Sequence, residues 1–122
     1  MAIRRGLMAA ASSATDYLIG VVWVDGYLIN DAGGVSANAN SKYTDTYIPV
    51  IPGNSYVLSG KAYSIAAYDR IHGYNAEKAW QSRLYRFDWP KGEFSSTITI
   101  PTGCYYIRIS TERTTEISMF DA

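Results

Sequence analysis

Aromatic side chains are the residues best suited to chemistry in this sequence. The chain holds 11 tyrosines, 3 tryptophans and 3 phenylalanines in 122 residues. Tyrosine and tryptophan combine a large apolar ring with one polar atom. Such a ring, placed beside a few fixed polar groups, can stack on the apolar C–H face of a sugar while the polar groups bind its hydroxyls. The candidate rings are Tyr27, Tyr74, Trp80 and Trp89, and the candidate polar partners are Asp69, Asn75, Gln81 and Arg83.

A purely structural use of the same rings stays open. Tyrosine is common in half-buried strands, and Trp80 and Trp89 could instead be hydrophobic anchors that pack the segment 72–92 onto the rest of the protein.

Catalytic and metal-binding patterns have little support, so we expect no enzyme activity and no cofactor. His72 is the sole histidine, in a turn-like stretch, and we expect it to be exposed or satisfied by hydrogen bonds. Zinc needs three or four His or Cys ligands, and the lone Cys104 is expected in a buried strand. Two arrangements remain open: converging carboxylates for glycoside cleavage, and calcium bound by loop residues. Their candidates are Asp69, Glu77 and Asp88 for cleavage, and Asp25, Asp31 and Asp45 for calcium.

Composition predicts one folded globular domain. Hydrophobic residues make up 48% of the chain and charged residues 18%, with 11 Lys and Arg against 11 Asp and Glu. A chain with no net charge and no basic face is a poor partner for nucleic acid. No apolar run approaches the roughly 20 residues of a membrane span, so membrane insertion is not expected.

Strand patterns predict an all-β protein: an antiparallel, jelly-roll-like β-sandwich of about eight strands over residues 16–122, preceded by an N-terminal arm over residues 1–15. Turns are expected at Asp25-Gly26 and Pro52-Gly53, and a long surface loop over 31–42. The segment 72–92 fits either a short helix capped by Asn75 or an irregular excursion. The expected strands are 16–24, 27–30, 43–50, 54–60, 63–69, 93–101, 104–110 and 116–120.

Alternation along the strands predicts which side chains face the core. In 93–101 one face carries Phe94, Ser96, Ile98 and Ile100. In 104–110 we expect Tyr105, Ile107 and Ile109 to point inward. Pro49 lacks an amide donor, which places it at a sheet edge or a bulge. Asp69 and Arg108 are expected to pair across two strands.

These segments together resemble a family of jelly-roll modules. The similarity covers residues 20–110 and departs from the family pattern over 72–92. The family, often described as carbohydrate-binding-like, occurs in bacteriophage and prophage virion proteins and in gut-bacterial surface proteins. The motifs that carry the resemblance are Gly26-Tyr27-Leu28-Ile29, Thr46 to Tyr56 with its Pro52-Gly53 turn, Ala67-Tyr68-Asp69, Thr97 to Pro101, and Tyr106 to Ser110.

The resemblance implies a non-enzymatic virion protein, assembled in the bacterial host cytoplasm, that binds a carbohydrate of the host surface. The alternative is a purely structural virion protein, such as a capsid decoration or fibre subunit, that uses its aromatic residues for subunit contacts. Both predict a homo-oligomer, with a trimer as the first expectation. The arm over residues 1–15 is expected to contact other virion proteins.

Overall fold

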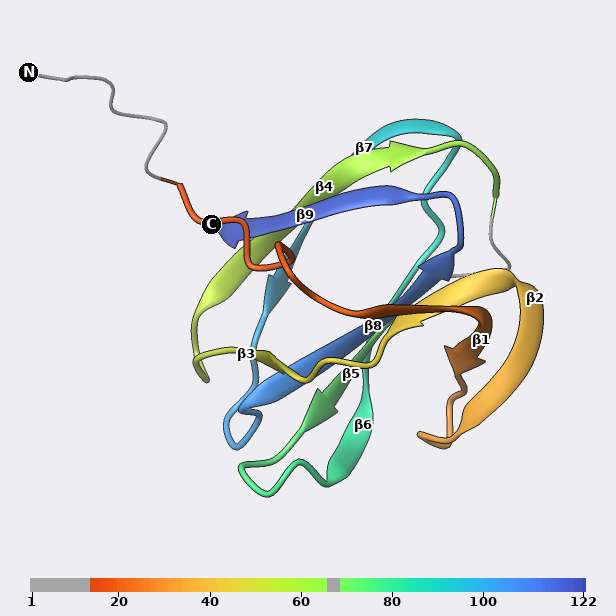
Figure 1. The fold of residues 1–122 in the computed structure, drawn as a ribbon. Coiled ribbons are helices and arrows are strands. Elements are labelled where there is room, and N and C mark those ends of the chain that lie inside the picture. Colours follow the sequence, from red (N-terminus) through yellow and green to blue (C-terminus); the bar gives the residue numbers. More distant parts are fainter. Residues whose placement is uncertain (1–13, 66–68) are drawn as a thin grey trace, which may run out of the picture.

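Short runs of β-branched and aromatic residues form the strands of this protein (Figure 1). The computed structural model describes residues 14–65 and 69–122. Within these ranges lie nine strands: β1 (Trp23–Ile29), β2 (Val35–Thr44), β3 (Ile48–Pro49), β4 (Ser55–Ala62), β5 (Asp69–Tyr74), β6 (Trp80–Phe87), β7 (Gly92–Thr99), β8 (Tyr106–Glu112) and β9 (Glu116–Asp121).

The strands form two antiparallel sheets. The larger sheet has the order β1-β2-β8-β5-β6, with the short β3 also paired to β8, and the smaller sheet has the order β7-β4-β9. Every paired strand runs antiparallel to its neighbour. The two sheets face each other as the layers of a sandwich (Figure 1). The expected all-β antiparallel sandwich is therefore confirmed.

Alternate residues of the facing strands fill the space between the sheets. Ile107 and Ile109 of β8 and Leu58 of β4 are fully buried there. Each aliphatic side chain of this size stabilises the fold by about 1.5–3 kcal/mol when it is removed from water. Leu18, which precedes the first strand, adds to the same core.

The hairpin of β1 and β2 folds over the outer face of the larger sheet. The amide of Ile29 donates to Oγ of Ser110 on β8, and its carbonyl contacts Nε2 of His72 on β5. Both partners alternate with core residues, so they point away from the core. The side chains of Ser110 and His72 on this outer face are consequently buried as well.

The two ends of the described chain meet beside β9. The amide of Tyr17 donates to the carbonyl of Met119, and the Asp16 carboxylate accepts from the amide of Met119. The Tyr17 hydroxyl donates to the Asp121 carboxylate at 2.9 Å. These bonds occupy part of the open edge of β9. Residues 1–13 of the expected arm lie outside the described residues.

The first hairpin differs from the sequence expectation. Residues 17–20 form turns rather than a strand, and β1 runs through Asp25-Gly26 without reversing. Gly26 has φ +87° and lies at an irregularity where residues 38–41 of β2 stand opposite it. An Asp-Gly pair accepts positive φ equally well in a bulge, which explains why the turn prediction was wrong. The predicted loop 31–42 is for the most part strand β2.

The segment 72–92 is neither a helix nor an irregular excursion: it completes β5 and forms β6 as a hairpin. Bulges between Ile71 and His72 and between Gly73 and Tyr74 break the period of two that would have indicated strands. His72 therefore lies in a strand, fully buried, and not in a turn. Of the strand expected over 63–69, residues 63–65 are not strand, and 66–68 lie outside the described residues.

Other expectations about side chains divide into confirmed and wrong ones. The Pro52-Gly53 turn, the inward face of 93–101 and the edge position of Pro49 are confirmed. Cys104 is buried as expected, but it precedes β8 and does not lie in a strand. Tyr105 is exposed rather than inward, because it precedes β8. Asp69 does not pair with Arg108: it shares the core side with Thr111, while Arg108 lies on the opposite face.

Candidate functional site

Trp80 begins β6 at the tip of the β5–β6 hairpin. Asn75 shapes the connection, because its Oδ1 accepts from the amides of Glu77 and Ala79 at 3.0 and 2.9 Å. Lys78 takes a positive φ of 65° in the same turn. The turn sets Trp80 opposite Tyr74 on the outer face of the sheet. Asn75 thus acts on the backbone, as a local cap.

One face of the Trp80 ring lies against the backbone of Gly33. A Cβ atom at Gly33 would stand 2.5 Å from Cδ2 and 2.6 Å from Cγ of the indole, and Gly33 has φ +87°. Only glycine allows both this approach and this conformation. Asn30 holds the turn in place, since its Oδ1 accepts from the amides of Ala32 and Gly34. The β1–β2 turn thereby forms the backing of the indole.

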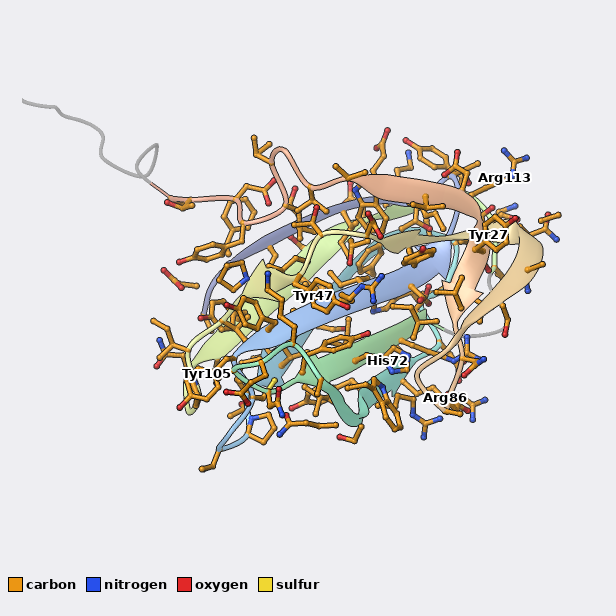
Figure 2. The ribbon with its side chains drawn as sticks, turned by 60° about the horizontal axis from the view of Figure 1, so that its bottom comes forward. Tyr27, Tyr47, His72, Arg86, Tyr105 and Arg113 are labelled. Carbon is orange, nitrogen blue, oxygen red and sulfur yellow. The ribbon has the colours of Figure 1, made fainter. Side chains whose placement is uncertain are left out.

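A hydrogen bond to His72 fixes the edge of the same ring. Nε1 of Trp80 donates to Nδ1 of His72 at 3.0 Å. Indole nitrogen is only a donor, so Nδ1 must be unprotonated, and Nε2 carries the proton and donates to the carbonyl of Ile29 at 3.2 Å. Burial lowers the pKa of His72 to about 4, which keeps the imidazole neutral near pH 7. Figure 2 shows His72 on the outer face of the sheet.

A carboxylate and two guanidinium groups lie beside Trp80. Asp31 accepts from Nε of Arg70 at 3.0 Å and pairs with Nη1 of Arg83 at 3.1 Å. Desolvation opposes ionisation of Asp31, but the hydrogen bonds from Arg83 and Arg70 outweigh it and hold the pKa of this carboxyl below its usual value. Arg70 is buried, whereas the side chains of Asp31 and Arg83 are half and one-third exposed.

These contacts leave a defined surface, which we call the Trp80 surface: Trp80, Asp31 and Arg83. The indole is 36% exposed. Gly33 covers one ring face and His72 binds the Nε1 edge, so the exposed part of Trp80 lies outside these two contacts. Asp31 offers acceptor oxygens and Arg83 offers N–H donors next to it. Sugar-binding sites combine a flat apolar ring with a fixed donor and acceptor of this kind.

A shallow pocket of about 370 Å³ lies on the other side of β6, between this strand and the end of β7. Its floor combines apolar groups of Leu84, Pro101 and the Tyr85 ring. The Tyr85 hydroxyl accepts from the amide of Thr99 at 2.9 Å, which ties the two sheets together at this point. Polar atoms come from Ser82, Arg83 and Thr99.

The other sequence-predicted binding residues do not join the Trp80 surface. Trp89 is buried in a series of stacked rings, Tyr85–Phe87–Trp89–Phe94, with centroid spacings of 5.5, 5.5 and 4.1 Å. Asp69 is buried on the core side, where it accepts from Thr111 Oγ1 and the amide of Trp89.

Tyr74 and Tyr27 do not contribute to it either. Tyr74 lies opposite Trp80 in the sheet but is buried, with its ring 4.9 Å from that of Tyr47. Tyr27 is exposed on β1, and Figure 2 shows it at the upper right of the view, above His72. Of the predicted set, the structure therefore brings together Trp80 and Arg83 at one surface, with Asn75 in the turn that precedes it.

Residue types alone do not indicate Asp31 as a partner of Arg83, because the two lie 52 positions apart and meet only where the β1–β2 hairpin folds over the larger sheet. They also do not indicate a cluster around Arg108. The Arg108 guanidinium lies 5.2, 4.6 and 5.6 Å from the ring centroids of Tyr43, Tyr47 and Tyr74, and its Nε donates to the carbonyl of Thr44. The outward position of Arg108 in the strand pattern was the available signal.

Within the described residues, no three His, Cys, Asp or Glu side chains come together to hold a metal ion. Of the calcium candidates, Asp31 pairs with Arg70 and Arg83, and Asp45 lies 3.7 Å from Arg108. Residues 14–65 and 69–122 also contain no helix long and apolar enough to cross a membrane.

No protein-family description matches the chain, and no curated protein is similar to it.

Proposed function

We propose that this protein is a non-enzymatic bacteriophage virion component that binds a carbohydrate of the host surface through the Trp80 surface. The observation that carries the carbohydrate part is the fixed, partly exposed Trp80 side chain on the strand that also carries Arg83, the partner of Asp31. The virion part rests on the resemblance of residues 20–110 to phage and prophage jelly-roll modules, and the sandwich fold is compatible with it.

Preorganisation supports this proposal. A surface aromatic ring that must be ordered on binding loses side-chain entropy, which weakens the complex by about 0.5–1.5 kcal/mol. Here Gly33 and His72 hold the Trp80 ring in place in the absence of any ligand. The same holds for Asp31 and Arg83, which fix each other. Hydroxyls on neighbouring carbons of one sugar could accept from Arg83 and donate to Asp31, as charge-assisted hydrogen bonds.

The Asp31–Arg83 pair favours a neutral sugar. Asp31 lies between the guanidinium groups of Arg70 and Arg83, but Arg70 is buried, so the groups at the surface are one carboxylate and one guanidinium. A carboxylate or sulfate on the sugar would therefore meet repulsion from Asp31 as well as attraction to Arg83. A neutral pyranose uses both groups without this conflict.

A structural role in the virion is the second candidate, and exposed apolar side chains favour it. Ile19, Ile51 and Ile65 are exposed by 80, 60 and 69%. Contacts between subunits in the virion would remove these apolar side chains from water. Under either proposal the protein works as a homo-oligomer in the virion, where several copies provide avidity or lattice contacts.

A glycan array tests the carbohydrate proposal. We expect the purified protein to bind a set of neutral glycans and Trp80→Ala to lose this signal. Tyr63→Ala is the matched control, because Tyr63 is also an exposed aromatic residue, and its hydroxyl donates to Glu116 on β9 of the smaller sheet. Circular dichroism would verify that both variants are folded.

The two candidate functions give different results in this experiment. Absence of binding by the wild-type protein, or equal binding by wild type and Trp80→Ala, would refute the carbohydrate proposal. Co-sedimentation of the non-binding protein with phage shells would then favour the structural role.

A further inference from the structure

We propose that the carbohydrate site extends over the edge of β6 into the pocket lined by Ser82, Arg83, Leu84, Tyr85, Thr99 and Pro101, so that the protein binds an oligosaccharide with one ring on Trp80 and the next in the pocket. This inference rests on the proposed function.

Arg83 connects the two places. Its guanidinium pairs with Asp31 at the Trp80 surface, and the residue also lines the pocket. Trp80 and Ser82 are separated by one residue on the same strand, so the position that carries the ring and the first position that lines the pocket are about 7 Å apart along the backbone. This spacing suits neighbouring units of one chain better than two independent ligands.

The composition of the pocket matches a sugar ring. Leu84, Pro101 and the Tyr85 ring provide apolar surface for the C–H face. Ser82, Arg83 and Thr99 provide polar atoms at the rim for hydroxyls. At about 370 Å³ the pocket is at the lower end of the range of about 300–1,000 Å³ for small-ligand sites, which is adequate for one small ring.

The position of β6 adds hydrogen-bonding groups. β6 ends the larger sheet, with β5 as its neighbour on the inner side. Every second residue of a terminal strand directs its backbone N–H and C=O away from the sheet. Sugar hydroxyls can both donate to and accept from such groups on β6, which provides four of the residues that line the pocket.

The test compares matched mono-, di- and trisaccharides of glucose, galactose, mannose and N-acetylglucosamine on one array. We expect the wild-type protein to bind the di- and trisaccharides of at least one series about tenfold more tightly than the monosaccharide, or about 1.4 kcal/mol. Ser82→Tyr, which fills the pocket, should remove this gain and preserve monosaccharide binding. Thr97→Tyr places the same side chain on the exposed face of β7 and should behave as wild type.

A measurement on the unmodified protein provides an independent readout. In ¹⁵N NMR spectra, the trisaccharide should shift the amides of Ser82, Leu84 and Thr99, whereas the monosaccharide should shift mainly the amides around Trp80. These shifts do not depend on the folding of any variant.

The results separate the two proposals. Equal affinity for all chain lengths, an unchanged gain in Ser82→Tyr, or no trisaccharide shifts at Ser82 and Thr99 would overturn the pocket inference while the Trp80 site stands. Absence of binding to any saccharide would overturn both.

Discussion

Gly33 contacts the Trp80 ring. Its replacement with alanine should lower the unfolding free energy more than the same change at any other described glycine with a positive φ. The positive φ alone costs about 1–2 kcal/mol for a residue with a Cβ. In addition, the new Cβ would stand 2.5 Å from the indole, so the ring must move. Movement breaks the bond from Trp80 Nε1 and leaves the buried Nδ1 of His72 without a donor, at about 1–3 kcal/mol.

Gly53 provides the matched control for this change. Its φ is +88°, close to that of Gly33, but a Cβ there meets nothing within 4 Å. We therefore expect Gly53→Ala to lose about 1–2 kcal/mol and Gly33→Ala to lose about 2–5 kcal/mol of unfolding free energy. Urea unfolding followed by far-ultraviolet circular dichroism measures both values.

The same comparison in a Trp80→Ala background isolates the ring contact. Without the indole there is nothing for the new Cβ to displace, so Gly33→Ala should then cost no more than Gly53→Ala. Equal losses of the two glycine variants in the wild-type background, or an excess loss that persists without Trp80, would refute the proposed backing of the ring.

Two further predictions concern buried polar groups. As the pH decreases from 6.5 to about 4, His72 takes up a proton in the unfolded chain but not in the folded protein, so the unfolding free energy should decrease as the pH decreases. The His72→Gln variant cannot titrate at this position. Relative to it, urea unfolding should show that the wild-type protein loses up to about 3 kcal/mol over this pH range. Arg108→Met should lower the unfolding free energy by about 2–4 kcal/mol, because Thr44 loses its donor and three tyrosine rings lose their cation. Arg108→Lys should recover little of this in the same assay, and a lysine variant as stable as wild type would contradict the role of the planar guanidinium.

Alternation in the clean strands made the sandwich predictable. Phe94, Ile98 and Ile100 face the core as expected, and the Pro52-Gly53 turn joins β3 to β4 at the expected place. Where bulges interrupt the period of two, as in β5 and β6, the pattern no longer indicates strands and the prediction fails.

The site was predictable only in part, because its residues come from separate hairpins. Trp80 and Arg83 could be identified by type, since they stand close together on one strand. Asp31 and Gly33 come from the β1–β2 turn and His72 from β5, and nothing in the spacing of the sequence encodes their contacts with Trp80 and Arg83. Trp89 shows the opposite case, a residue of the right type whose burial in the ring stack follows from tertiary packing.

The hydrogen bond between Tyr17 and Asp121 holds the first and the last part of the described chain close together at one end of the sandwich. Figure 1 shows the tip of the β5–β6 hairpin and the β1–β2 turn at the lower end of the view, away from the C-terminus. A tether at the C-terminus would therefore direct the Trp80 side chain away from the point of attachment. For a solid support this means that immobilisation through a C-terminal tag leaves Trp80 accessible from solution.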